Sequence, residues 1–178
     1  MTSFDLQSRP QPPANVDETG TLLGFLEFQR ATFAWKFGGV DAAGMRATIA
    51  ASTMSLGGLV KHLAIVEDWW FSMSLLGAAA DSRWSHIDWE ADRDWEWRTA
   101  ADDSPEELMS LWQEVVERSR TNLAKVLPEG WDRPAATPWD DGQRPSLRWV
   151  VCHMIEEYAR HNGHADLLRE SVDGATGE

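Results

Sequence analysis

Residues 147–170 read LRWVVCHMIEEYARHNGHADLLRE, and the apolar residues of this stretch recur at the spacing of an α-helix. Ser146, directly after Pro145, predicts the start of the helix, and Gly174 predicts its end. Glu157 and His161 fall on the same side of this helix as its apolar residues, which are Leu147, Val150, Val151, Met154, Tyr158, Ala165 and Leu168. Two polar side chains are therefore expected to face the core.

Three further helices are predicted before this one, each with an apolar stripe. The clearest start signal is Ser104-Pro105-Glu106-Glu107, which combines a capping serine, a proline at the first helical position and a glutamate three residues after the cap. Ser55 is a second good capping residue. The three helices are expected at about residues 17–37, 55–77 and 104–128.

Four helices of similar length, with no segment that alternates like a strand, predict an all-α fold, an antiparallel four-helix bundle. Two connections of this bundle are long, at about 79–103 and 128–145, and long loops in a compact domain are often functional. We expect residues 17–173 to form a single domain, preceded by a flexible arm at 1–16 and followed by a frayed end at 174–178.

Composition narrows the possible partners. The 178 residues carry a formal net charge of −13, which disfavours binding to nucleic acid or to an anionic membrane. The single cysteine, and the lack of a leader peptide or a long apolar run, predict a cytoplasmic protein. The 11 tryptophans suggest a large apolar pocket or an interface, and a homodimer is compatible with this composition.

Histidine and glutamate spacing in the last helix suggests a metal site. Glu157 and His161 are four residues apart and project from one helix face, so both can reach one ion. His153 lies two turns from His161, ~12 Å along the axis, which is too far to share that ion comfortably. The third ligand should come from a facing helix, where His62 lies on the apolar side.

Three protein ligands leave one position open, as in catalytic zinc sites, although nickel, iron, cobalt or manganese also accept such ligands. The simpler alternative is chance spacing together with a hydrogen-bonded core histidine at position 62. A shared cation is favoured because burying Glu157 without a partner costs several kcal/mol.

Three stretches give the chain a family resemblance: STMSLGGLVKHLAIVEDWWF at 52–71, DWEWR at 94–98, and the stretch at 147–170. With them, residues 17–173 resemble the DinB/YfiT-like metalloprotein superfamily, specifically its mycothiol transferase-like branch. The pattern is similar to the His-Glu-His variant in the metal-binding domain of mycothiol-dependent maleylpyruvate isomerase, which binds zinc. The resemblance implies that His62, Glu157 and His161 are metal ligands.

The same resemblance implies thiol chemistry. Members of the family transfer a low-molecular-weight thiol, such as mycothiol or bacillithiol, to a small electrophile. The first hypothesis is therefore a metal-dependent thiol transferase, in which the reacting group is a metal-bound thiol. The alternatives are a metal-dependent hydrolase that uses metal-bound hydroxide, and a non-catalytic protein that binds a metal or ligand.

Other polar residues lie close to this group in the sequence. His164, one turn beyond His161, could be an alternative ligand, a proton shuttle or a partner that orients a ligand. Arg160 and Arg148 could bind a substrate carboxylate, but an ordinary ion pair is the simpler interpretation. His153 is offset from the apolar stripe, and we expect it to be structural.

Two further features have alternative interpretations. Cys152 is expected to be a small buried core residue, with a nucleophilic role as the alternative. The segment DSRWSHIDWEADRDWEWR at 81–98 is rich in acids and tryptophans: Trp84, Trp89, Trp95 and Trp97. It could form a lid over the metal pocket, with Trp95 and Trp97 against the substrate, or pack over a bundle end or a dimer partner.

Overall fold

The computed structural model describes residues 4–5 and 7–176, and within them the fold is all-helical, without strands. The predicted fold class, all-α, is confirmed in these residues. Two short helices, α2 (Ala42–Arg46) and α4 (Trp95–Thr99), accompany four long ones. The long helices are α1 (Glu18–Phe37), α3 (Leu56–Asp68), α5 (Pro105–Val126) and α6 (Leu147–Asp173).

Local sequence explains where the long helices begin. The Ser55 hydroxyl accepts a hydrogen bond from the Gly58 backbone N–H at 3.1 Å, and this caps α3. At α5, Ser104 and Glu107 form the reciprocal capping box that their spacing predicts. Ser146 caps α6 by accepting from the Trp149 N–H. These caps satisfy backbone N–H groups that otherwise have no partner at a helix start.

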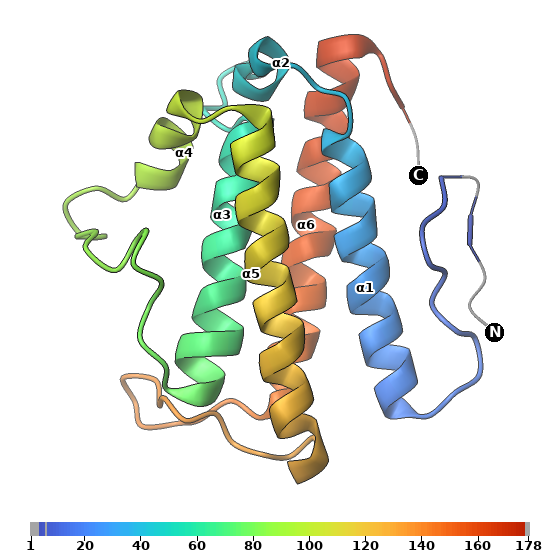
Figure 1. Cartoon of the computed structure of the whole chain (residues 1–178), viewed down its shortest axis with the longest axis vertical. Helices are drawn as coiled ribbons and strands as arrows, with labels where there is room; N and C mark the ends of the chain where they lie inside the picture. Colours follow the sequence, from blue (N-terminus) through green and yellow to red (C-terminus); the bar gives the residue numbers. More distant parts are fainter. Residues whose placement is uncertain (1–3, 6, 177–178) are drawn as a thin grey trace.

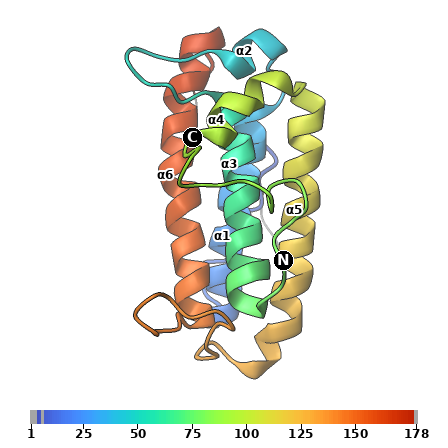
Figure 2. The ribbon, with the colours of Figure 1, turned by 90° about the vertical axis from the view of Figure 1, so that its left-hand side faces the viewer.

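The four long helices lie side by side, and their directions differ from a simple antiparallel order (Figure 1). The helices α1 and α6 pack most closely together and run the same way, and α3 and α5 form a second parallel pair that runs the opposite way. The reason is the long connection after α3, which carries the chain back along the molecule before α5 begins. This connection crosses in front of α3 (Figure 2).

The chain between the long helices contains short helical pieces that the apolar periodicity does not predict. After Asp68 the helix continues as a wider π-helix over Trp69–Ser74, and Gly77, with a φ of +67°, ends it. The helices α2 and α4 have five residues each, too few to display a helical repeat. The helix α4 matters most, because it places DWEWR beside α3.

The core contains a polar network with one residue from each long helix. The Arg30 guanidinium donates to both carboxylate oxygens of Glu67, at 2.8 and 2.7 Å. The Tyr158 hydroxyl donates to Glu67 Oε1 at 2.7 Å and accepts from Trp112 Nε1 at 2.9 Å. All four side chains are buried. We call this group the core network.

Two residues of the core network, Arg30 and Tyr158, have raised pKa values. Burial alone would lower the pKa of Arg30, but the adjacent carboxylate of Glu67 outweighs it and raises the pKa. Burial raises the pKa of Tyr158, and the negative charge of Glu67 adds to this shift. The network therefore contains a charged arginine and a neutral phenol, and both are hydrogen-bonded to Glu67.

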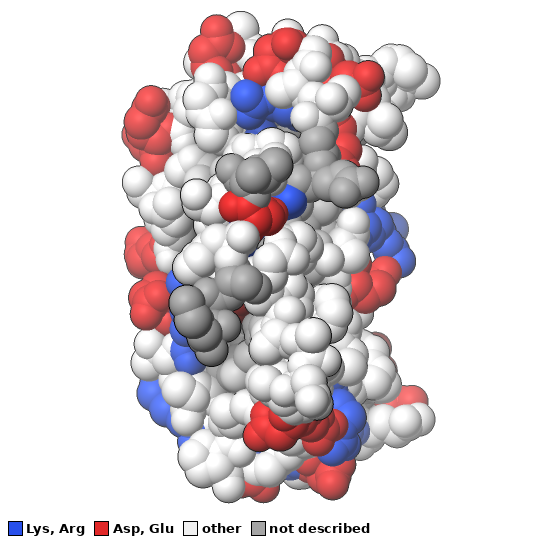
Figure 3. All heavy atoms as spheres, turned by 90° about the vertical axis from the view of Figure 1, so that its right-hand side faces the viewer, with Lys and Arg blue, Asp and Glu red and all other residues white. Residues whose placement is uncertain are grey.

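The described part of the N-terminal arm lies against α1. Arg9 donates to the Thr32 hydroxyl at 3.0 Å, and its guanidinium lies over the rings of Phe28 and Trp35 at about 5 Å. Residues 1–3 and 6 of the predicted arm, and 177–178 of the predicted frayed end, lie outside the described residues. On the face that carries the arm, Lys and Arg lie mostly beside Asp and Glu (Figure 3).

Among the described residues, no helix has the length and apolarity needed to cross a lipid bilayer.

Candidate metal centre

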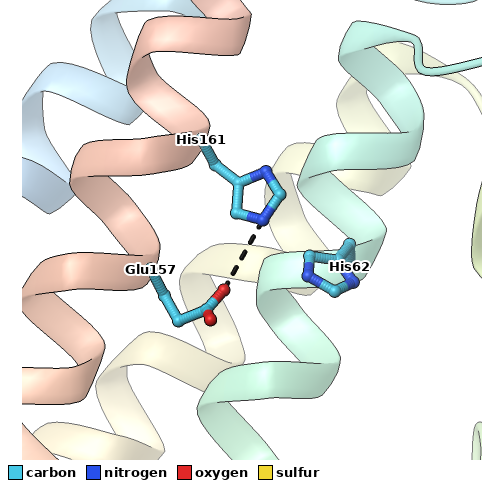
Figure 4. A group of neighbouring side chains, drawn as sticks. All are labelled: His62, Glu157 and His161. Carbon is cyan, nitrogen blue, oxygen red and sulfur yellow. Dashed lines mark ion pairs between the residues drawn. The ribbon is translucent and has the colours of Figure 1, made fainter. Parts of the chain in front are cut away.

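The structure brings together the three side chains that the sequence selected. His62 on α3 faces Glu157 and His161 on α6 across the space between these helices (Figure 4). One nitrogen or oxygen atom from each residue lies within 4.8 Å of the others. Glu157 Oε2 and His161 Nε2 are 3.5 Å apart. His161 is buried and the other two are partly buried.

This geometry fits a divalent cation. Donor atoms around a tetrahedral ion at ~2 Å from each are ~3.3 Å apart. Glu157 and His161 already have nearly this spacing, and the donor atom of His62 lies within 4.8 Å of both. The neighbouring His161 ring lowers the pKa of Glu157 and outweighs the opposing effect of partial burial, so the carboxylate is ionised and able to bind a cation. Two imidazoles and one carboxylate are suitable zinc ligands.

Each of the three residues has an outer partner, as is typical of metal ligands. His62 Nδ1 lies 3.2 Å from Glu96 Oε1, which leaves Nε2 to face the other ligands. His161 Nδ1 lies 3.3 Å from His164 Nδ1, which fits the predicted supporting role of His164. Burial, together with the nearby His161, lowers the pKa of His164 and favours the neutral ring that can accept this hydrogen bond.

His153 lies on the other side of the glutamate. Its Nε2 is 3.7 Å from Glu157 Oε1, so the two oxygens of Glu157 face different histidines. The His153 ring stacks on Trp149, with centroids 4.9 Å apart, and meets Trp70 edge-on at 4.8 Å. The expected structural role is compatible with these contacts, and His153 also holds Glu157 from outside.

Glu96 was missed by the sequence reasoning, although it lies within the DWEWR stretch. The neighbouring Trp97 stacks on the His62 ring with centroids 5.1 Å apart and planes at 23°. Trp97 has room for this because residue 58 is glycine: a Cβ there would lie 2.5 Å from Trp97 Cε3. The short helix α4 therefore supplies both a hydrogen-bond acceptor and a flat surface for His62.

Other predicted candidates lie away from the three donors. Trp95 packs beside Lys61, whose ammonium is 4.8 Å from its ring, rather than beside His62. Arg160 is exposed and pairs with Glu156, so the ion-pair interpretation describes it. Arg148 likewise pairs with Glu18 and with Asp132, which lies in the connection after α5.

The expectation that Cys152 is buried was wrong. Its side chain is exposed. The physical reason is rotation along α6: the neighbouring Val151 and Met154 point into the core, and position 152 falls outside their stripe.

The tryptophan-rich segment at 81–98 has an anchored first part and a later part that lines a cavity. Its first part is anchored, because Asp68 accepts hydrogen bonds from Trp84 Nε1 and from the Asp81 N–H, both at 2.9 Å. Arg118 on α5 pairs with Asp81 at 2.9 Å. Its later part lines a cavity of about 300 Å³, which we call the tryptophan cavity. The residues around it are His62, Ile65, Val66, Trp69, Trp70, Trp89 and Glu96.

An all-helical fold with two histidines and a glutamate facing one another between long helices defines a helical protein with a candidate metal centre. The family described as Mycothiol-S-transferase matches residues 21–174, and the chain belongs to this family, part of the DinB/YfiT-like superfamily. No curated protein matches the chain.

Proposed function

We propose that the protein is a metal-dependent transferase that moves a low-molecular-weight thiol, such as mycothiol, to a small electrophile. The observation that carries the proposal is the convergence of His62, Glu157 and His161 from two helices, in a chain of the Mycothiol-S-transferase family. We assign these residues as ligands of a divalent ion, zinc in the first instance. We also assign residues 17–173 to a single DinB-like four-helix bundle domain.

The three ligands would leave one coordination position open toward a thiol. A divalent ion supplies Lewis acidity there, which lowers the pKa of a coordinated thiol so that its sulfur is anionic near neutral pH. Glu96 and His164 fix the orientation of the His62 and His161 rings from outside. Glu157 contributes as a ligand, and its lowered pKa keeps it in the charged form required for that role.

The remaining chemistry is a substitution at carbon. The thiol loses its proton to solvent, and its sulfur forms a bond to the electrophilic carbon. The bond from that carbon to its leaving group breaks, and the leaving group departs with the electron pair. The chain contributes by placing the two reactants beside each other and by limiting the access of water, which the tryptophans around His62 favour.

Metal analysis and thiol transfer test the proposal together. Protein purified without an affinity tag or chelator should contain about one zinc per chain, or take it up on titration, and should conjugate mycothiol to a bimane electrophile. Removal of the metal should abolish conjugation and zinc should restore it. His161→Ala should lose both properties, whereas His86→Ala, at an exposed histidine, should retain them. Conjugation by metal-free protein would overturn the proposal.

We further propose a cytoplasmic homodimer. The exposed rings of Trp139 and Trp149 contact each other, with centroids 5.1 Å apart, and supply an apolar surface that a second copy could cover. Sedimentation equilibrium should show a dimer that Trp139→Ser weakens, and a monomer at all concentrations would exclude this.

A further inference from the structure

The tryptophan cavity lies directly beside the candidate metal centre, because His62 belongs to both. Its volume of about 300 Å³ is at the lower end for small-molecule sites. Apart from His62 and Glu96, the residues around it are apolar: Ile65, Val66 and three tryptophans. Flat tryptophan surfaces favour flat apolar ligands, because stacked rings bury a large contact area.

Glu96 is the one carboxylate among the described residues that line the cavity. Its Oε1 lies near His62, whereas its Oε2 is buried and has no hydrogen-bond partner among the residues that the structure describes. The residue is 8% exposed, so solvent hardly reaches this oxygen. Buried acceptors are nearly always paired in folded proteins, so an unpaired oxygen on a residue that lines the cavity indicates a ligand donor that reaches it once the carboxylate turns toward the cavity.

The negative charge near the cavity further restricts which ligands can bind. Glu96 and Glu157 place two carboxylates around the position where an anionic thiol sulfur is expected. Together these three negative charges exceed the charge of one divalent cation. An anionic ligand entering the cavity would be repelled, and it would also lose its hydration against apolar walls.

We propose that the tryptophan cavity is the electrophile site and that it takes an uncharged, flat aromatic molecule carrying an N–H or O–H donor, which Glu96 Oε2 accepts. The role of this ligand as the electrophile rests on the proposed transferase function. The position of the cavity beside His62 places the ligand next to the thiol, and Trp69, Trp70 and Trp89 determine its shape.

Three matched probes test the ligand class without any reaction. Benzamide is uncharged and carries an N–H donor, methyl benzoate has a similar shape without the donor, and benzoate is an anion. Calorimetric titration of the zinc-loaded full chain should show benzamide binding about tenfold more tightly than either of the others. Equal affinity for benzamide and benzoate, or tighter binding of methyl benzoate, would overturn the proposal.

Two variants and one control locate the binding. Glu96→Gln should remove most of the preference for benzamide over benzoate, since an amide can donate to a carboxylate. Glu90→Gln removes the same charge at an exposed position of the same segment and should leave the preference unchanged. Val66→Trp should fill the cavity and abolish benzamide binding without altering Glu96. Benzamide binding that survives Val66→Trp, or a preference unchanged by Glu96→Gln, would place the ligand elsewhere.

The outcome is separable from that of the proposed function. Benzamide binding requires neither thiol nor turnover, so a protein that fails to conjugate mycothiol but shows the expected preferences retains the ligand site and loses the transferase role. Conversely, metal-dependent conjugation by a protein that does not bind benzamide supports the transferase and rejects the cavity as the electrophile site.

Discussion

Two clusters of polar side chains lie between the long helices, and they differ in how completely their hydrogen-bonding groups are paired. In the core network, hydrogen bonds of 2.7–2.9 Å link a buried arginine, glutamate, tyrosine and tryptophan. In the candidate metal centre, Glu157 and His161 are 3.5 Å apart, the three donor atoms lie within 4.8 Å of one another, and Glu96 Oε2 has no partner among the described residues. A complete network is typical of a structural role, and an incomplete one indicates a site that binds something.

The largest expected effect is on the core network. Glu67→Gln should lower the free energy of unfolding by about 3–5 kcal/mol, because it leaves the buried charge of Arg30 without its counter-ion. Urea unfolding followed by circular dichroism measures this. Glu117→Gln, at an exposed ion pair with Arg120, is the matched control and should change little. If both variants behave alike, the core network is not a structural element.

The candidate metal centre should respond to zinc rather than to substitution alone. Zinc at a hundredfold excess over its dissociation constant should raise the free energy of unfolding of the parent by about 2.7 kcal/mol. His161→Ala should lose this gain, and His86→Ala should keep it. Melting temperatures with and without zinc measure the difference, and an equal gain in His161→Ala would place the ion elsewhere.

Glu96 connects the metal centre with the tryptophan cavity, and its effect on metal binding should be smaller. Glu96→Gln should weaken zinc affinity about 10–100-fold, the usual cost of losing the carboxylate partner of a ligating histidine. Competition with a chromophoric chelator gives the affinity, and Glu90→Gln is the control. Unchanged affinity in Glu96→Gln would show that Glu96 does not orient His62.

The smallest effect concerns the anchor of the tryptophan-rich segment. Hydrogen bonds from Arg83 lower the pKa of Asp81 below its usual 3.8. Because the folded-state pKa is the lower one, Asp81 stabilises the fold above about pH 3.8 and loses this contribution as the pH falls further. Acid unfolding of Asp81→Asn should therefore be less steep between pH 4 and 2 than that of the parent, and identical curves would contradict the anchor.

The sequence predicted those features that depend on residues close together in the chain. Caps such as Ser55 and Ser104 and the four-residue spacing of Glu157 and His161 are local, and the structure contains them. His62 required an argument about a facing helix together with a family resemblance, because its contacts with α6 are distant in the chain.

Features that depend on distant pairing escaped prediction. Glu96 reaches His62 across 34 positions, and Arg30 reaches Glu67 across 37. No periodicity encodes such pairs, and nothing in the run KHLAIVED shows that Lys61, Glu67 and Asp68 are all buried. The parallel order of α3 and α5 likewise depends on the path of the long connection between them. No periodic pattern in the sequence specifies that path.

The close approach of Trp97 to Gly58 has an evolutionary consequence. Any side chain at position 58 would displace the indole that covers His62, although the backbone there is ordinary helix. The two positions are therefore expected to drift together: relatives with a larger residue at 58 should carry a smaller one at 97, and their histidine should lack its stacked neighbour.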